Sequence, residues 1–339
     1  MSKIMIKNLE KSFGKAKVLD NIHFEVEEGQ VVSLLGPSGC GKTTTLKMIA
    51  GLIRPDKGDI LLRNHSILKV PVEKRGIVIV FQEHLLFPHL NIEENIGFGL
   101  KMAKRPKGEI KIQVEKMLEL VKLKGYNKKY PHELSGGQQQ RIALARALAV
   151  EPKVLLLDEP FSSLDTKLRE EMRELTLEIQ KKLRMTTILV THDQEEALIC
   201  SDKIAIMLNG QIKQFDTPEE LYKNPTSIEI ANFFGAKNYI NGQIENGFFQ
   251  SDIIHVPTEK ENTKDAKLMV KQEDIELFPL GITDLSGQVI SSKFAGEKIY
   301  YSVSVKGYEL KVISPSQTVY KVGEAVSIRI KLERVILFE

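Results

Sequence analysis

The chain has 339 residues, long enough to bury a sizeable core and to form about two domains. Its 48 basic and 45 acidic side chains leave a net charge of +3, which is too balanced to indicate a nucleic-acid partner. Two cysteines exclude a disulfide framework and favour a reducing compartment. No apolar run approaches the roughly 18–20 residues that span a bilayer, and the first residues lack the apolar stretch of a secretory signal, so we expect work at a membrane to need other subunits.

Residues 1–80 contain short β-rich segments that lead to a glycine-rich loop. The apolar run at residues 30–35 predicts a buried strand that ends at Gly36. Residues 36–43 then match G-x-x-x-x-G-K-[ST], in which backbone N–H groups and a helix N-terminus hold phosphates. A helix is predicted from Thr43 to Ile49, ended by Gly51. By itself this motif indicates only a nucleotide.

Residues 85–150 are helical and more charged. The apolar spacing of residues 114, 117, 118 and 121 predicts one buried helix face. The basic residues between Lys101 and Lys107 are interpreted as a solvated surface, with an anion-binding patch as the alternative. Ser135 has the character of a helix N-cap, so the helix that follows can turn its positive end towards an anion.

Residues 151–235 alternate between strands and helices. Residues 154–157 predict a buried strand that ends in Asp158 and Glu159, and residues 187–190 predict another, with His192 just beyond it. Asn209-Gly210 suits a hairpin turn with positive φ angles. Between the two strands, an amphipathic helix is predicted with one face formed by Leu168, Met172, Leu175, Ile179 and Leu183. Such alternation predicts an α/β sheet whose strand ends form the site.

After about residue 235 the periodicity changes to two. Residues 299, 301, 303 and 305 alternate in this way, as do Val326, Ile328, Ile330 and Leu332. We expect a small β-barrel there, with a domain boundary near residues 235–240.

Residues 1–235 resemble the ATP-binding cassette of ABC transporters. The phosphate loop at 36–43 is followed in the family's order by Gln82 (Q-loop), residues 134–138 (signature), Asp158-Glu159 (end of Walker B), residues 162–165 (D-loop) and the switch residue His192. The resemblance implies a P-loop NTPase fold in which a RecA-like α/β core carries an antiparallel β subdomain and a helical subdomain at about 85–150. Residues 236–339 resemble the small all-β TOBE domain, an OB-like barrel, of importer ATPases.

The resemblance also implies which residues bind ATP. Phe13 takes the position of the aromatic that stacks on adenine, and the signature completes the phosphate site of an opposite, head-to-tail subunit. The residues expected to contact nucleotide are Phe13, Gly36, Pro37, Ser38, Gly39, Cys40, Gly41, Lys42, Thr43, Thr44, Ser135, Gly136, Gly137, Gln138 and Asp165.

Five positions carry the expected metal and hydrolytic chemistry. Thr43, Gln82 and Asp158 are predicted to hold Mg²⁺, which prefers oxygen ligands. Glu159 is the predicted general base, while His192 contacts the γ-phosphate and Gln82 senses metal and water. The alternatives are an ordinary ion-pair role for Glu159 and ordinary polar roles for Gln82 and His192.

Two other positions leave alternatives open. Phe13 could be a core aromatic instead of an adenine platform. Cys40 occupies a variable loop position, and we expect no catalytic role, with a redox-sensitive gate as the alternative.

The expected partners follow from the resemblance. They are a second copy of the chain, transmembrane permease subunits docked near residues Leu85–Pro88, and indirectly a solute-binding protein, with no nucleic acid. Burial inside the helical subdomain is the alternative for Leu85–Pro88. We expect a peripheral location at the cytoplasmic face of the membrane.

The predicted function is an ATP-hydrolysing importer subunit. Residues 270–275 depart from the family's Arg-Pro-Glu at Lys271 and Gln272, and the compact tail favours a polyamine, ferric iron or inorganic anion over a sugar. The alternatives are a soluble cassette ATPase acting on ribosomes or DNA and a non-catalytic regulatory module.

Overall fold

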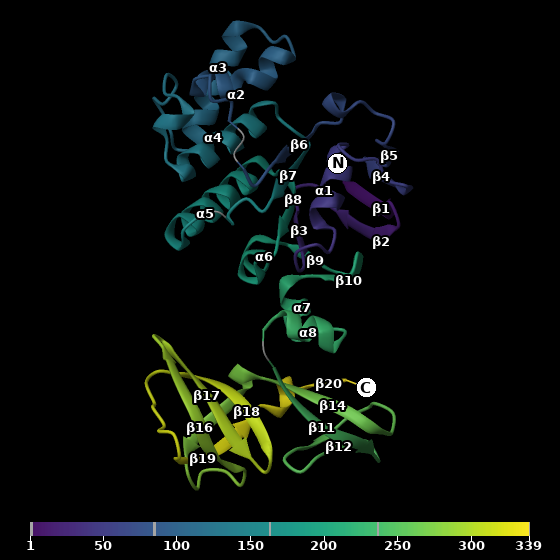
Figure 1. Ribbon diagram of the computed structural model, residues 1–339, viewed down its shortest axis with the longest axis vertical. Coiled ribbons are helices and arrows are strands. Elements are labelled where there is room, and N and C mark those ends of the chain that lie inside the picture. Colours follow the sequence, from purple (N-terminus) through teal and green to yellow (C-terminus); the bar gives the residue numbers. More distant parts are fainter. Residues whose placement is uncertain (1–2, 84–85, 163, 236, 339) are drawn as a thin grey trace. The chain divides into compact units, whose positions relative to one another are not determined.

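The computed structural model describes residues 3–83, 86–162, 164–235 and 237–338, which form two compact units, residues 1–221 and 222–339 (Figure 1). The domain boundary expected near residues 235–240 remains a prediction. The compact units divide earlier, so the short helix α8 (Ile228–Phe233) belongs to the second unit, while α7 (Pro218–Lys223) has residues in both.

The first unit is built on two sheets. A six-stranded sheet has the order β10-β9-β3-β8-β7-β6, in which β9, β3, β8, β7 and β6 are parallel and β10 is antiparallel to β9. A four-stranded antiparallel sheet has the order β2-β1-β4-β5. The strands are β1 (Ile4–Phe13), β2 (Ala16–Val26), β3 (Val31–Leu35), β4 (Lys57–Leu62), β5 (His65–Ser66), β6 (Ile77–Val80), β7 (Val154–Asp158), β8 (Thr186–Thr191), β9 (Lys203–Leu208) and β10 (Gln211–Asp216).

Two apolar clusters cover the two faces of the six-stranded sheet. Side chains alternate along β7, so that Leu155 and Leu157 join the helical cluster whereas Val154 and Leu156 pack towards the antiparallel sheet. A strand buried on both faces needs a continuous apolar run, which is why residues 154–157 are all aliphatic. In Figure 1, α2, α3 and α4 gather on one side of the first unit and the antiparallel sheet on the other. The helices are α1 (Lys42–Ala50), α2 (Ile92–Met102), α3 (Lys107–Leu120), α4 (Gly136–Ala149), α5 (Thr166–Leu183) and α6 (Gln194–Cys200), with short 3₁₀ turns η1 (Val72–Lys74) and η2 (Pro131–Glu133).

The second unit is all-β apart from short helical segments, as predicted. One antiparallel sheet has the order β13-β12-β11-β14-β20 and the other β15-β19-β16-β17-β18, and both contribute to one apolar core. Ile328 is buried in β19, but Leu332 is 41% exposed and lies beyond that strand, because the chain turns after Ile330. The elements are β11 (Lys237–Glu245), β12 (Phe248–Gln250), β13 (His255–Pro257), β14 (Thr263–Lys271), η3 (Gln272–Asp274), β15 (Ile275–Pro279), β16 (Ser286–Ala295), β17 (Lys298–Val305), β18 (Tyr308–Pro315), β19 (Ala325–Ile330), η4 (Leu332–Arg334) and β20 (Ile336–Phe338).

Candidate nucleotide site

Predicted binding and catalytic residues from four motifs lie at one edge of the six-stranded sheet. Strands β3, β8, β7 and β6 are neighbours and run parallel, so their carboxyl ends meet at the same edge. The phosphate loop follows β3, Asp158 ends β7, His192 follows β8, and Gln82 follows β6. The topology therefore brings four separate sequence motifs to one edge.

The loop between β3 and α1 has the form of a phosphate cradle. Gly39 and Gly41 adopt φ angles of 83° and 103°, which favour glycine. Gly41 is the N-cap of α1 and offers no side chain to the first-turn N–H groups, which are left for an anionic ligand. Lys42 is 5% exposed and donates from Nζ to the carbonyl oxygens of Gly36 (2.7 Å) and Pro37 (2.9 Å). The loop thus offers positive charge and N–H donors, which fits a nucleotide phosphate.

Cys40 lies in the wall of this loop. Its Sγ atom is 3.9 Å from Lys42 Nζ, and the side chain is buried. Burial raises the pKa of the Cys40 thiol, although Lys42 opposes the effect. A protonated, buried thiol is a poor nucleophile, which disfavours the redox-gate alternative.

A hydroxyl and a carboxylate meet where the expected metal would be held. Thr43 Oγ1 donates to Asp158 Oδ1 at 3.0 Å, and Asp158 is 7% exposed. Burial raises the pKa of Asp158, and the neighbouring Glu159 adds to this. Mg²⁺ is usually held by one or two carboxylates together with substrate phosphates, so this oxygen pair beside the phosphate loop fits it.

Glu159 and His192 form a second pair at the same edge. His192 Nδ1 lies 3.0 Å from Glu159 Oε2, and the Glu159 backbone N–H donates to the Val190 carbonyl at 2.9 Å. Glu159 adopts a φ of 47°, an uncommon conformation for a residue with a side chain. The two side chains are partly exposed, 21% and 52%. The carboxylate is therefore placed where it can reach a water molecule and the imidazole together.

Beneath His192 lies a carboxyl group that the sequence reasoning missed. Glu196 is 4% exposed and its Oε2 accepts from Thr191 Oγ1 at 2.9 Å, while Thr191 Oγ1 accepts from the Asp193 N–H at 2.9 Å. Burial raises the pKa of Glu196 to about 7. In the sequence Glu196 lies in a polar helix start, where no local pattern distinguishes it from the exposed Glu195. In the structure its hydrogen bonds hold the turn that carries His192.

The signature segment begins α4 with a complete capping box. Ser135 Oγ accepts from the Gln138 N–H at 3.4 Å, and Gln138 Oε1 accepts from the Ser135 N–H at 3.1 Å. Among the described residues, the Ser135 side chain bonds within its own helix and makes no contact with the phosphate loop. The buried Gln140, also missed from sequence, donates from Nε2 to the Pro160 carbonyl and so ties α4 to the turn after Glu159.

Phe13, Gln82 and Asp165 are exposed side chains next to the ends of strands or helices. Phe13 ends β1, is 49% exposed and has Lys11 Nζ 5.5 Å from its ring centroid, so it is not a core aromatic. Gln82 is exposed just after β6. Asp165 caps α5 by accepting from the Leu168 N–H at 3.1 Å, whereas Ser163 lies outside the described residues.

Of the segment 85–88, Leu85 lies outside the described residues, and Phe87 is firmly held. The side chain of Asn95, itself buried, accepts from the Phe87 N–H at 2.9 Å and donates to its carbonyl at 3.1 Å. The Phe87 ring packs on Phe98 with centroids 4.5 Å apart. Leu86 is partly buried against the helical core, and Pro88 is exposed. The segment is therefore anchored at Phe87 and open at Pro88.

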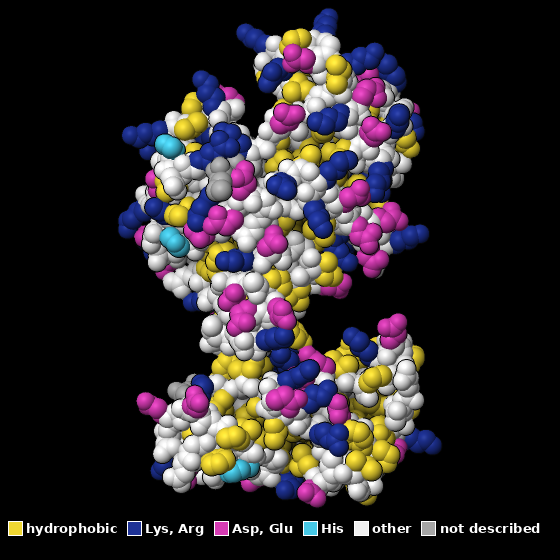
Figure 2. Space-filling view, turned by 180° about the vertical axis from the view of Figure 1, so that it is seen from behind, with side chains coloured by type: hydrophobic (Ala, Val, Ile, Leu, Met, Phe, Trp, Pro, Cys, Tyr) yellow, Lys and Arg dark blue, Asp and Glu magenta, His cyan; other side chains and the backbone are white. Residues whose placement is uncertain are grey.

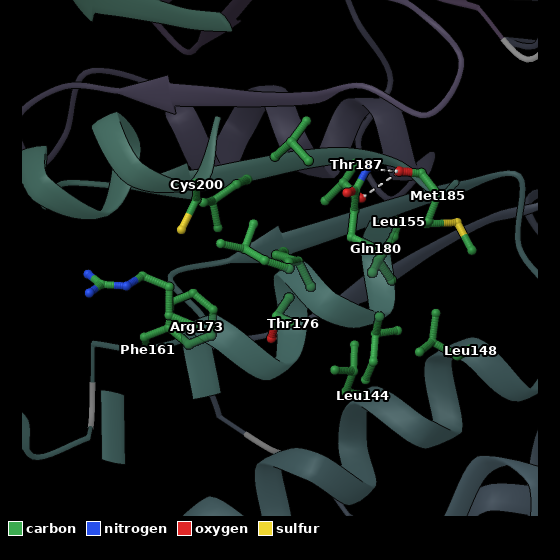
Figure 3. A pocket seen from close by; sticks show the side chains of 15 residues that line it. Leu144, Leu148, Leu155, Phe161, Arg173, Thr176, Gln180, Met185, Thr187 and Cys200 are labelled. Carbon is green, nitrogen blue, oxygen red and sulfur yellow. Dashed lines mark hydrogen bonds between the residues drawn. The ribbon is translucent and has the colours of Figure 1, made fainter. Parts of the chain in front are cut away.

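A small apolar cavity lies behind the site and is a packing gap. It lies between α4, α5, β3, β7 and β8, has a volume of about 20 Å³, and is lined by side chains such as Leu144, Leu155 and Met185 (Figure 3). That volume holds about one water molecule. Gln180 spans its edge by donating to the Met185 and Gly29 carbonyl oxygens at 3.0 and 2.7 Å. The cavity is too small to bind a nucleotide.

Comparison with known proteins matches this site to a family. Residues 19–162 match the model of the ABC transporter family. The chain is 43% identical over 331 residues to the spermidine/putrescine import ATP-binding protein PotA of Clostridium acetobutylicum, covering 96% of this chain and 94% of that protein. It is 40% identical over 316 residues to the Fe(3+) ions import ATP-binding protein FbpC of Vibrio cholerae, covering 91% and 89%. A PotA protein of Spiroplasma citri is 40% identical over 337 residues, covering 97% and 95%.

The fold and the site thus define a nucleotide-binding cassette with a C-terminal β domain. The chain belongs to the ABC transporter family, among the ATP-binding subunits of importers, and it is an ATPase. Among the described residues, no helix combines the length and the apolar character that crossing a bilayer requires.

Proposed function

We propose that this subunit hydrolyses ATP at the sheet edge described above to drive uptake of a polyamine through separate membrane subunits. The observation that carries the catalytic part is the pairing of Thr43 with Asp158 and of Glu159 with His192 beside one phosphate loop. Uptake of ferric iron is the second candidate, because an Fe(3+) importer subunit is nearly as similar as the PotA proteins.

The phosphate loop would bind and neutralise the triphosphate. Lys42 and the free N–H groups of α1 face the position where β- and γ-phosphates bind, and Phe13 offers a half-exposed ring for the adenine. Bound Mg²⁺ would offset phosphate charge, held by Thr43 and Asp158 with Gln82 nearby.

Glu159 would act as the general base. Its carboxylate accepts a proton from the attacking water, while His192 holds the γ-phosphate and keeps Glu159 in place through the 3.0 Å contact. Gln140 and Glu196 act as positioning residues, since each fixes a turn that carries one of these groups.

The remaining machinery is supplied by partners. The capping box leaves the Gly136-Gly137 turn of α4 free to face the phosphates of a second, head-to-tail subunit, and Asp165 lies at the start of the neighbouring helix α5. The segment around Phe87 and Pro88 would receive a permease helix at the cytoplasmic face of the membrane, with a solute-binding protein acting through the permease.

Glu159→Gln tests the hydrolytic site. With general-base catalysis worth roughly 10²–10⁴-fold, turnover should fall by at least about 100-fold, while ATP binding persists and an ATP-bound dimer accumulates in light scattering. Glu195→Gln, an exposed carboxylate on α6, is the matched control and should keep native turnover. Unchanged turnover in Glu159→Gln would refute the assignment of the base.

Uptake by cells tests the solute. A strain without this chain should lose uptake of labelled spermidine and putrescine and regain it with the native chain but not with Lys42→Ala. Loss of labelled ferric iron uptake with normal polyamine uptake would select the second candidate. Normal uptake of both would overturn the solute proposal and leave the ATPase assignment untouched.

A further inference from the structure

The second unit contains a hollow that the ATPase function does not use. It has a volume of about 520 Å³ and is lined only by residues between Tyr222 and Ile313. Pockets of roughly 300–1,000 Å³ are the usual size of small-molecule sites. This hollow is therefore large enough for a metabolite.

One wall is a polar face of the sheet β16-β17-β18. Ser291 pairs with Ser302, which pairs with Lys311, and Lys293 pairs with Tyr300, the next rung on the same face. Paired residues point to the same side of a sheet, and so do residues two apart along a strand. The ammonium groups of Lys293 and Lys311 thus stand on one face with two hydroxyl groups between them, and neither forms an ion pair with a carboxylate in the described part of the chain.

The opposite wall adds a third cation. Lys237 Nζ donates to the Phe234 carbonyl at 3.1 Å and lies 4.9 Å from the centre of the Tyr222 ring. Lys271 Nζ lies 4.5 Å from the same ring, although Lys271 does not itself line the pocket. Burial lowers the pKa of both lysines, which means that each ammonium group lacks part of the stabilisation it has in water.

The one carboxylate in the lining is already engaged. Glu273 Oε1 accepts a hydrogen bond from the Tyr222 hydroxyl. Among the lining residues the lysines Lys237, Lys293 and Lys311 outnumber this carboxylate three to one, so the lining keeps a net positive charge even though Glu273 also attracts Lys237.

The walls are joined by a short, rigid contact. The Asn238 side chain donates to the Lys311 carbonyl at 2.8 Å and accepts from the Lys311 N–H at 2.7 Å. Asn238 is 5% exposed and follows Lys237 directly, so the same hydrogen bonds set the spacing between two of the lysines. The pocket is thus preformed, which lowers the ordering cost of binding.

We propose that this pocket binds a small, multiply charged organic anion, whose phosphate or carboxylate oxygens are held by Lys237, Lys293 and Lys311 and by the hydroxyl groups of Ser291 and Ser302. Tyr300, 43% exposed, contacts the non-polar part of the ligand. A polyamine of similar size is rejected, because it would place ammonium groups beside three lysines. The site is thus distinct in charge from the proposed transported solute.

Calorimetric titration of the full chain tests the proposal, with citrate and pyrophosphate as probes and spermidine as the oppositely charged control. The native chain should bind at least one anion with a sub-millimolar Kd and should show no spermidine binding that depends on these lysines. The double variant Lys293→Gln/Lys311→Gln should weaken anion binding by about tenfold or more, as expected for charge-assisted hydrogen bonds. The double variant Lys306→Gln/Lys321→Gln removes the same charge from exposed positions of the second unit outside the pocket and should change binding less than about twofold.

The outcomes separate cleanly. A loss confined to citrate assigns a carboxylate ligand and a loss confined to pyrophosphate a phosphoryl ligand, and either supports the site. Pyrophosphate can also bind the phosphate loop, but that binding would be equal in both double variants. Equal anion affinity in both double variants, or no binding by the native chain at millimolar anion, overturns the proposal. Because the substituted lysines are exposed, thermal unfolding should be the same for all variants.

Discussion

Glu196 offers a quantitative test of how the switch region is built. Its carboxyl group is buried at 4% exposure, and its Oε1 atom has no hydrogen-bond partner among the described residues. Burial raises its pKa from 4.5 to about 7. At 1.36 kcal/mol per pH unit, that difference corresponds to about 3 kcal/mol of unfolding free energy.

The direction of the effect follows from proton binding. Between pH 4.5 and 7 the folded state keeps the proton on Glu196 and the unfolded state loses it, so the contribution of this group to stability is complete below about pH 4.5 and is lost as pH rises to about 7. Glu196→Gln replaces the carboxyl group by a neutral amide of the same shape. The unfolding free energy of the variant, compared with that of the native chain, should therefore increase by about 3 kcal/mol between pH 4.5 and pH 8.

Urea unfolding between pH 4.5 and pH 8, followed by circular dichroism, measures this difference. In thermal unfolding the same energy corresponds to a relative shift of about 6–12 °C for a unit of this size. Glu195→Gln is the control, because that carboxylate is exposed and should change the pH profile by less than about 0.5 kcal/mol. If the native chain and Glu196→Gln have parallel pH profiles, Glu196 is not a buried carboxyl group that resists ionisation and the described network is wrong.

Other predictions concern the phosphate loop and the helical region. Gly36→Ala would place a methyl group 2.2 Å from the Met207 carbonyl oxygen, so ATP binding measured with a fluorescent analogue should be lost. Gly39→Ala has open space around its Cβ position but a strained φ, so this variant should bind ATP more weakly without complete loss. Thr43→Val should raise the Mg²⁺ concentration needed for half-maximal turnover by about tenfold, and an unchanged requirement would remove Thr43 from the metal site. Asn95→Ala should cost about 2–4 kcal/mol in urea unfolding, because it leaves the backbone groups of Phe87 unpaired; a loss below about 1 kcal/mol would show that water replaces these bonds.

Local sequence patterns were sufficient to predict much of the structure of this protein. The glycine spacing at 36–41 demands a tight turn whatever surrounds it, and the left-handed φ angles of Gly39 and Gly41 meet that demand. The Ser135–Gln138 capping box and the alternation along β17 are likewise short-range, since both partners or all alternating positions lie within a few residues. The family resemblance extended these patterns to ATP hydrolysis by an importer subunit.

Other features depend on residues far apart in the chain. The contact of Thr43 with Asp158 joins positions 115 residues apart, and it exists because β3 and β7 lie on either side of β8 with their carboxyl ends aligned. Glu195 and Glu196 are adjacent glutamates that the local sequence does not distinguish, and only the packing of α6 against the sheet decides which one is desolvated. In the same way, Lys293 and Lys311 became a pair only through the register of β16, β17 and β18.

The distribution of charge, too, depends partly on the sequence alone and partly on the packed structure. On the face that Figure 2 presents, basic and acidic side chains are interspersed over both units, as the balanced composition indicates. Composition, periodicity and motif spacing are sums over neighbours in sequence, and they determined the class of protein, its ATPase motifs and its all-β tail. Desolvation and cross-strand register are properties of the packed chain, and they decided which carboxylate titrates near neutral pH and where three lysines converge.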